Sequence, residues 1–427
     1  MSNWKEVKLK ELIQEMGDGG TPTTTDVSNF GGDIPWVVVD DVVSDIYTTK
    51  ETLTEKGFNK CSAKKWPKGS IILTTGATIG QVGIARIDLC TKQGITGIIP
   101  NEFANNIFLK FWFEANTKQL IRYAQGTTFK EIRPRSLGNI RISIPNPFTK
   151  KGLHEQTAIA TILSKIDEGI KATTESIVAA KKLKKALMQN LLSGKLKPDG
   201  NWRTEDEFYE DEKFRKVPKG WEIARVKDYG FLQTGKTPPT AEPNVFSENK
   251  DELRFPFITP GDLGELKYIN SSERYVTTKG IGYSYKIPVG AICVVCIGST
   301  IGKIGITTIE SCTNQQINTL IPNENNSGEF FYYMMEFCKN HFKEIAGINA
   351  TPQINRSDFN KYKMLRPKEK IEQEEIAVKL ISIDKDILKR IHKIKSLERL
   401  KKSLMQQLLT GKKRLSKETI AYINQTV

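Results

Sequence analysis

The chain has 427 residues, of which 38% are hydrophobic and 26% charged, and its formal net charge is +15. This composition excludes a disordered or fibrous chain and fits two or three globular domains. No apolar run is long enough to cross a bilayer and the first ten residues lack a signal-peptide core, so we expect a cytoplasmic protein without a membrane partner. The basic excess predicts a polyanionic partner, although a lysine-rich surface alone would give the same charge.

The first 152 residues predict a mixed α+β domain. Short β-branched runs separated by turns are typical of strands, and one longer stretch has the period of a helix. The strand-like runs are IPWVVVDDV, GSIILTTG, QVGIARI and GITGIIP, and the helical stretch is FLKFWFEANTKQLIRYA.

A long helix is predicted directly after this domain, over residues 153–196. Apolar residues recur at spacings of three and four from Ile159 to Leu191, no proline interrupts them, and Gly194 ends the pattern. About 38 helical residues span roughly 57 Å at 1.5 Å each. An apolar stripe of this length needs an equally long partner to cover it.

The rest of the chain repeats this order. Residues 197–220 contain proline, glycine and an acidic run without an apolar period, which predicts a crossover linker. Residues 221–370 carry a second set of strand-like and helical runs and predict a second mixed α+β domain. Residues 371–412 predict a second long helix, and the tail 413–427 predicts a short appended helix.

An internal duplication relates the two halves. EQTAIATILSKIDEGI (155–170) aligns with EQEEIAVKLISIDKDI (372–387) at an offset of 217, and the endings ALMQNLLSGK and SLMQQLLTGK share that offset. GATIGQVGIARIDLCTKQGITGIIPN aligns with GSTIGKIGITTIESCTNQQINTLIPN at an offset of 222, with 14 identical positions. Trp4 aligns with Trp221, so each half runs from a Trp to a Ser/Thr-Gly-Lys ending. The architecture is therefore one unit used twice.

Two helices that each begin where a globular domain ends most simply pack lengthwise as a coiled coil. We predict an antiparallel pair, because a duplicated unit that closes on itself by a two-fold axis makes a self-complementary contact. A parallel pair is the alternative. The predicted fold class is α+β, with two mixed α+β domains joined by two long helices in an antiparallel coiled coil and an internal pseudo-two-fold repeat.

Motifs for catalysis or metal binding are weak. GFLQTGKT (230–237) matches the phosphate-binding pattern G-x-x-x-x-G-K-[ST], but Pro238 and Pro239 follow where that loop requires a helix. The three histidines are isolated, and Cys293 and Cys296 would point to opposite faces of a buried strand. We therefore expect no catalytic residue, no metal site and no cofactor in this chain.

The best candidates for binding lie where the two halves differ. GTTFKEIRPRSLGNIRI (126–142) and GINATPQINRSDFNKYKM (347–364) are rich in hydroxyl, amide and basic side chains. Arg reads guanine, Asn and Gln read adenine, and Ser, Thr and Lys hold phosphates. An ordinary polar loop is the alternative. We predict DNA contacts by Thr127, Thr128, Lys130, Arg133, Arg135, Thr351, Gln353, Asn355 and Arg356.

The combination of motifs resembles the specificity subunit of Type I restriction-modification systems. Each globular segment contains GxTIGxxGI, and each is followed by a long helix with EQxxIA…ID and an L(M)xxLL(S/T)GK ending. The resemblance covers Trp4 to about Lys412. It implies two target recognition domains on double-stranded DNA, each reading one half of a bipartite, asymmetric target, with adenine methylation and cleavage carried out by partner subunits.

The resemblance also implies the partners. Methyltransferase (modification) subunits would dock on the helices, restriction/translocase subunits would join them, and those partners would bind S-adenosylmethionine, ATP and Mg. A purely intramolecular coiled coil is the alternative use of the apolar stripe. As docking residues we predict Ile159, Ile166, Leu187, Leu191, Ile376, Ile383, Leu404 and Leu408.

Helices of fixed length would also set the number of unread base pairs between the half-sites, as dimer geometry sets half-site spacing elsewhere. Three other hypotheses stay open. One is a stand-alone double-headed DNA-binding protein without enzyme partners, and another is a methylation-only system. The third is an enzyme that uses the 230–237 segment, in which Lys236→Ala would abolish nucleotide binding.

Overall fold

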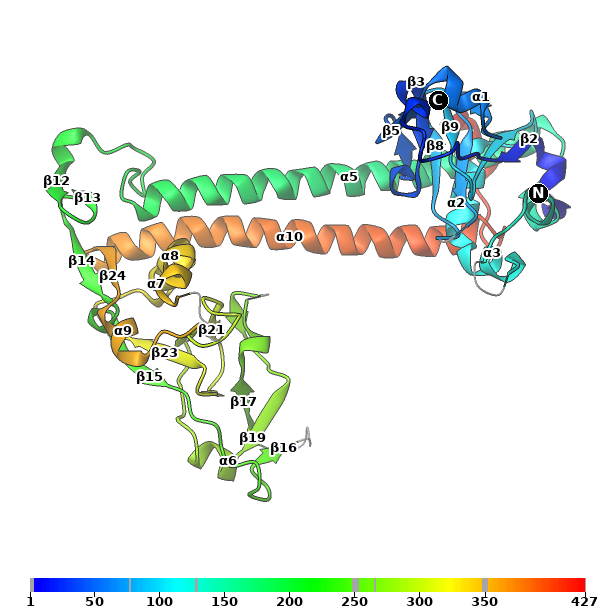
Figure 1. The fold of residues 1–427 in the computed structure, drawn as a ribbon. Coiled ribbons are helices and arrows are strands. Elements are labelled where there is room, and N and C mark those ends of the chain that lie inside the picture. The colour runs from blue at the N-terminus through cyan, green and yellow to red at the C-terminus, as the bar shows by residue number, and fades with distance from the viewer. Residues whose placement is uncertain are drawn as a thin grey trace. The chain divides into compact units, whose positions relative to one another are not determined.

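Two compact units make up the chain. The first, unit 1, comprises Met1–Glu175 and His392–Val427, and the second, unit 2, comprises Ser176–Ile391. Each unit holds one mixed α+β domain with part of the helix α5 (Lys150–Leu192) and part of the helix α10 (Lys370–Leu408) (Figure 1). The computed structural model describes residues 4–76, 78–126, 130–247, 253–264, 266–347 and 352–426.

Domain 1, the globular part of unit 1, is built on a five-stranded sheet in the order β2 (Ile13–Asp18), β10 (Ile95–Pro100), β7 (Ile71–Thr74), β8 (Val82–Ala85), β4 (Asp45–Ile46). A four-stranded sheet has the order β5 (Glu51–Leu53), β3 (Phe30–Val37), β9 (Leu89–Thr91), β6 (Lys65–Trp66). The remaining elements are the pair β1 (Trp4–Lys8) and β11 (Arg141–Pro145), and the helices α1 (Glu55–Asn59), α2 (Asn106–Ala115), α3 (Thr117–Tyr123) and α4 (Pro134–Gly138).

Domain 2, the globular part of unit 2, also contains a five-stranded and a four-stranded sheet. Its five-stranded sheet has the order β15 (Gly230–Thr234), β23 (Ile317–Pro322), β20 (Ile292–Val295), β21 (Ile304–Thr307), β18 (Tyr268–Ile269). Its four-stranded sheet has the order β16 (Phe246–Ser247), β19 (Arg274–Thr277), β17 (Arg254–Ile258), β22 (Cys312–Thr313). The remaining elements are the pair β14 (Trp221–Arg225) and β24 (Lys363–Pro367), and the helices α6 (Thr278–Gly282), α7 (Gly328–Phe337), α8 (Lys339–Ile345) and α9 (Arg356–Lys361). The five-stranded sheets of the two domains have matching strand orders, which confirms the internal repeat, whereas the four-stranded sheets differ in one edge strand, β6 in domain 1 and β16 in domain 2.

The central strands are buried over their whole length. All four residues of β7, β8, β20 and β21 are buried, which explains their continuous apolar runs in place of an alternating pattern. In unit 1, Phe108 and Trp112 of α2 pack in one core with Ile71 of β7. In unit 2, Phe330 of α7 packs in one core with Ile292 of β20.

The two long helices run antiparallel within each unit. In unit 1, Lys401 of α10 lies beside Asp167 of α5, and a Cβ on Gly169 would lie 3.6 Å from Leu397 Cδ1. Residue numbers therefore fall on α10 as they rise on α5. The pairs of unit 2 follow the same rule, since Ser176 bonds to Arg390 and Lys184 pairs with Asp384. The antiparallel prediction is confirmed, and the parallel alternative is excluded.

The helix α5 begins before the expected position 153, because Thr149 caps it. The Thr149 hydroxyl accepts a hydrogen bond from the Gly152 amide at 3.1 Å. The compact units also divide the chain differently from the expected domains, since each unit takes part of both helices.

The crossover between the halves is folded. Strands β12 (Phe208–Asp211) and β13 (Arg215–Pro218) form an antiparallel hairpin, and the Arg203 guanidinium donates to the Gly194 carbonyl at 2.7 Å. The tail forms α11 (Lys417–Thr426), and its Asn424 Nδ2 donates a 3.1 Å hydrogen bond to the carbonyl of His154 on α5. Short 3₁₀ helices complete the fold: η1 (Leu9–Leu12), η2 (Val27–Asn29), η3 (Val39–Asp41), η4 (Glu205–Glu207), η5 (Val226–Asp228) and η6 (Pro260–Asp262).

The phosphate-loop-like segment is a strand and its continuation. The segment GFLQT is β15, and the chain is irregular from Gly235 to Pro239, without the helix that a phosphate-binding loop requires. A Cβ on Gly235 would lie 2.0 Å from the Asn314 carbonyl oxygen, so this glycine allows a close approach of two backbone segments.

The thiols of the CxxC segment are buried in domain 2. Burial raises the pKa of Cys293 and of Cys296 to about 12, so both are neutral thiols at pH 7. Within the described ranges, no group of three or more His, Cys, Asp or Glu side chains is placed to hold a metal ion. No helix in the described part of the chain has the length and apolarity needed to cross a membrane.

Candidate nucleic-acid interface

In domain 1, the base of the loop that carries the predicted DNA contacts is fixed against the glycine-rich turn of the shared GxTIG segment. Gln125 and Glu131 exchange two backbone hydrogen bonds of 2.9 Å each and close the loop between them. The Ile132 amide then donates to the Thr75 carbonyl at 2.9 Å. The shared turn is therefore a scaffold for a loop whose sequence is not shared.

Domain 2 holds its loop in the same way. The Gln353 amide donates to the Ala346 carbonyl at 3.4 Å, and the Ile354 amide donates to the Cys296 carbonyl at 2.9 Å. The Gly298 amide of the shared turn donates to the Pro352 carbonyl at 2.9 Å. Two copies of one scaffold thus present two different loops.

The predicted cations of domain 1 are accessible. Lys130, Arg133 and Arg135 are exposed, and Arg133 and Arg135 flank the start of α4, where Pro134 is the first helical residue. Among the described residues, none of the three forms an ion pair, so their charges are available to a polyanion. Thr127 and Thr128 lie outside the described residues.

The predicted contacts of domain 2 are in part engaged within the domain. Asn355 caps α9, because its Oδ1 accepts from the Asp358 amide at 2.9 Å and its Nδ2 donates to the Asp358 carboxylate at 2.7 Å. The Arg356 guanidinium donates to the Leu232 carbonyl and lies over the Phe231 ring. The Gln353 side chain is exposed, and Thr351 lies outside the described residues.

We did not predict a pair of lysines that lies beside the shared turn of domain 2. A Cβ on Gly302 would lie 3.2 Å from Lys339 Cγ and 3.7 Å from Lys343 Cε, so both side chains pass over this turn from α8. In domain 1 the matching glycine, Gly80, faces Thr117 in place of a lysine. The four-residue spacing of these lysines puts both on one helix face, and this spacing is the sequence signal from which the pair could have been predicted.

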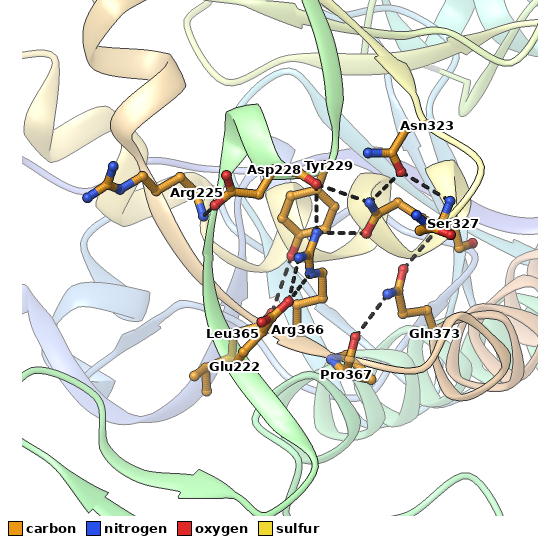
Figure 2. Close-up of polar contacts among 12 residues, drawn as sticks. Glu222, Arg225, Asp228, Tyr229, Asn323, Ser327, Leu365, Arg366, Pro367 and Gln373 are labelled. Carbon is orange, nitrogen blue, oxygen red and sulfur yellow. Dashed lines mark hydrogen bonds and ion pairs between the residues drawn. The ribbon is translucent and has the colours of Figure 1, made fainter.

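The repeated EQ pair at the start of each long helix attaches that helix to its domain. The Gln373 side chain is fully buried; its Oε1 accepts from the Ser327 amide at 3.0 Å and its Nε2 donates to the Pro367 carbonyl at 2.9 Å (Figure 2). In domain 1, Gln156 accepts from the Asn105 amide and donates to the Phe103 carbonyl, both at 3.0 Å. Ser327 and Asn105 are the N-caps of α7 and α2, so each Gln ties a long helix to a short one.

The glutamate of each EQ pair explains why each half begins with a Trp. Glu372 accepts from the Trp221 indole N–H at 3.0 Å, and Glu155 accepts from the Trp4 indole N–H at 3.4 Å. In Figure 2, Arg366 joins the same junction by pairing with Glu222 and by donating to the Asp228 carbonyl at 2.9 Å. The motif therefore has a structural role.

The repeated helix endings pack against the start of domain 1 and against the crossover that precedes domain 2. Gly411, at the end of α10, has φ +69° and faces Trp4, with 2.7 Å from a Cβ to the indole ring. Gly194, after α5, also has φ +69°, and a Cβ on it would lie 2.2 Å from Pro218 Cγ. Positive φ and these close approaches favour glycine at both positions. The duplicated decapeptide is thus the contact that closes each unit.

The predicted docking residues are occupied inside the chain. Buried positions among them are Ile159, Ile166, Leu191, Ile376 and Leu408. Leu187 and Leu404 pack against the cores of units 2 and 1, and Ile383 is half-buried. The apolar stripe of the helices is therefore covered within the chain. Docking of a partner stays a prediction, and a partner would have to bind other faces of the helices.

This fold and site define a protein with two copies of one domain scaffold, each carrying its own polar loop, and with two long antiparallel helices. The sequence matches the family described as Type I restriction modification DNA specificity domain over residues 1–181 and 218–421. The chain belongs to this family.

Two relatives have names that agree with this family. The chain is 32% identical over 277 residues to the Type I restriction enzyme MjaIX specificity subunit of Methanocaldococcus jannaschii, covering 64% of this chain and 60% of that protein. It is 32% identical over 203 residues to the HindI specificity subunit of Haemophilus influenzae, covering 46% and 42%. The chain thus aligns with less than two thirds of the length of either relative.

Two solved structures have a similar fold. The S subunit of a Type I restriction-modification system from M. genitalium superposes with a TM-score of 0.60 at 16% identity, covering 95% of this chain and 96% of that one. A chain from a study of complex assembly and conformational transition of the type I R-M system gives 0.55 at 17% identity, covering 96% and 98%.

Proposed function

We propose that this chain is the sequence-specific DNA-recognition subunit of a Type I restriction-modification complex, and that each domain reads one half of a bipartite target. The observation that carries the proposal is the repetition of one scaffold with two unlike polar loops, one per unit. Because the loops differ, the two halves of the target differ, and the whole target is asymmetric. The names of the relatives support the same role.

We assign the DNA contacts from the polar and charged side chains that are exposed. In domain 1, Arg133 and Arg135 are exposed and offer bidentate donors suited to guanine, while Lys130 holds a phosphate. In domain 2, the exposed side chain of Gln353 is the best placed base reader, and Lys339 and Lys343 hold the DNA backbone beside the shared turn. Asn355 and Arg356 act there mainly by shaping the loop.

The partners in this proposal are methyltransferase subunits and restriction/translocase subunits, which supply the chemistry together with S-adenosylmethionine, ATP and Mg. The recognition chain contributes no catalytic group. Its helices offer exposed apolar side chains outside the buried stripe, with Val178 64%, Leu183 55% and Val378 62% exposed in unit 2. Val178 and Leu183 lie on α5 and Val378 lies on α10, and the proposed docking uses these exposed faces of the two helices.

The proposal is tested by selection from random DNA. The complex of this chain with its methyltransferase subunits is incubated with a duplex library, and the retained molecules are sequenced. Two short fixed blocks separated by a constant number of unselected base pairs are expected. Recovery of one continuous block, or of no common sequence, would refute the two-reader proposal.

A separate assay with the restriction/translocase subunits added tests for cleavage of unmodified target DNA. Cleavage would indicate a full restriction system, and its absence a methylation-only one.

A paired substitution assigns the halves. Arg133→Ala with Arg135→Ala should relax the block read by domain 1 and leave the other block unchanged. Lys165→Ala, at an exposed position on α5, is the matched control for the loss of a positive charge. If the double variant relaxes both blocks equally, the assignment of one loop to one half-site is wrong.

A further inference from the structure

An ion cluster joins the two long helices to domain 1. The Nζ of Lys401, on α10, lies 2.7 Å from Asp167 Oδ1 on α5 and 3.2 Å from Glu114 Oε2 on α2. The lysine side chain is only 20% exposed. These three residues, the unit 1 triad, therefore connect three elements through one half-buried ammonium group.

Unit 2 contains the same cluster. The Nζ of Lys184, on α5, lies 2.9 Å from Asp384 Oδ1 on α10 and 3.3 Å from Glu336 Oε2 on α7. The side chain of this lysine is 17% exposed. Lys184, Asp384 and Glu336 form the unit 2 triad.

The duplication maps one triad onto the other. The lysines and the aspartates align at the offset of 217 that relates the helices, and the glutamates align at the offset of 222 that relates the domains. The two aspartates are those of the repeated Ile-Asp in the EQxxIA…ID motif. The helix that supplies the lysine alternates, since α10 gives it in unit 1 and α5 gives it in unit 2.

Each triad also has local support. Lys110 pairs with Glu114 at 2.7 Å in unit 1, and the Tyr333 hydroxyl donates to Asp384 at 2.6 Å in unit 2. The lysine ammonium lies 5.1 Å from the Phe111 ring centre in unit 1 and 5.5 Å from that of Tyr333 in unit 2. Phe111 and Tyr333 also align at the offset of 222. An aromatic ring beside the ammonium group is therefore repeated as well.

An ion cluster of this kind can specify the register of α5 against α10. Half-buried ion pairs add little net stability, because desolvation offsets the attraction, and their best-attested use is to specify one arrangement over others. The apolar stripe alone is tolerant, since Leu397, Leu400 and Leu404 offer similar surfaces about one turn apart, or about 5 Å along the axis. If α10 slid by one turn along α5, the Lys401 ammonium would contact neither the Asp167 nor the Glu114 carboxylate.

We propose that the two triads fix the register of α5 against α10 and the orientation of each domain on the helices, and that they thereby determine the spacing of the DNA target without reading any base. The inference rests on the proposed recognition function. The triad members are positioning residues, and the loops remain the readers.

Cross-linking measures the register without DNA. Gly169→Cys with Leu397→Cys reports the native register, because a Cβ at 169 faces Leu397 at 3.6 Å. Gly169→Cys with Leu400→Cys reports a slide of about one turn. In the otherwise unchanged full chain, oxidation should trap the first pair only. With Asp167→Asn and Lys401→Met added, the second pair should form at least about tenfold more disulfide than without them.

The functional arm uses duplexes that carry both half-sites with spacers from two base pairs shorter to two longer. The unsubstituted complex should methylate duplexes of one spacer length only. The Lys401→Met and Lys184→Met complexes should methylate duplexes with neighbouring spacer lengths at least about tenfold more efficiently than the unsubstituted complex does. The half-site bases should stay the same. Lys402→Met and Lys185→Met, at the adjacent exposed lysines, are the controls. The exchange Lys401→Asp with Asp167→Lys should restore a single spacer.

The outcomes separate the two proposals. Triad variants that melt like the unsubstituted chain, cross-link only in the native register and keep a single spacer would overturn the register proposal. If the unsubstituted complex recognises no bipartite target while the triad variants still shift the cross-link, the recognition function fails and the register role stands. Should a lysine variant not fold, Asp167→Asn and Asp384→Asn test the same contacts at constant side-chain volume.

Discussion

Replacing Gln373 by Leu should weaken unit 2 by an amount that the structure defines. The side chain is fully buried and makes two hydrogen bonds, with the Ser327 amide and the Pro367 carbonyl. Leucine has a similar volume but leaves both backbone groups buried without a partner, at about 1–3 kcal/mol each. The expected loss is about 2–6 kcal/mol. For a unit of this size, that corresponds to a fall in Tm of roughly 4–24 °C.

Hydrogen exchange locates the effect. The Ser327 amide should lose protection in the Gln373→Leu variant, whereas amides of β20, at the centre of the sheet, should be affected only through global unfolding. Gln406→Leu, at an exposed position on α10, is the control and should change stability by less than about 0.5 kcal/mol. A Gln373→Leu variant with unchanged Tm and unchanged Ser327 exchange would show that the junction is not held by this side chain.

Four further predictions concern other parts of the chain. Removing Lys339 and Lys343 by alanine substitution should weaken binding to all sequences alike and lower the slope of log K against log salt by about one for each lysine that holds a phosphate; a change of sequence preference would contradict their backbone role. Inserting seven residues, about two turns, at matched levels of α5 and α10 should lengthen the spacer and leave the half-sites unchanged. Methylome sequencing measures both, and changed half-site bases with an unchanged spacer would contradict this prediction. Because burial raises the pKa of Cys293 and Cys296 to about 12, both should resist alkylation at pH 8 and react only after unfolding, while half-buried Cys61 reacts in the native state; mass spectrometry of labelled peptides decides. Gly411→Ala should cost about 1 kcal/mol or more, from the positive φ and the close approach to Trp4, measured as a lower Tm of unit 1; an unchanged Tm would show that this end does not close the unit.

Much of the architecture followed from the sequence because the signals were repeated. The spacing of three and four over each long helix, and the offset of 217 between the helices, predicted two equivalent helices and an antiparallel pair. Apolar periodicity cannot say what covers a stripe, however. The resemblance implied a partner on Ile159 and Leu408, and the structure places both side chains in the core of unit 1.

The candidate site was predictable in outline, and its details depended on local geometry. Asn355 carries the side chain of an adenine reader, but the order Asn355-Arg-Ser-Asp358 is also a helix-capping signature, and the structure uses it as a cap. The triads could not be predicted, because Glu114, Asp167 and Lys401 come from three elements and meet only in the folded unit. The EQ motif was visible twice, and its role required the caps of α2 and α7.

Genome-wide mapping of adenine methylation by single-molecule sequencing tests the central claim most directly. The host expresses this chain with its methyltransferase subunits, and the comparison is the same host without this chain. We predict a split, asymmetric motif that disappears when this chain is removed, and whose two blocks are altered separately by substitutions in the loops of domains 1 and 2. A methylome that is unchanged by removal of this chain, or a single continuous motif, would contradict the two-reader account.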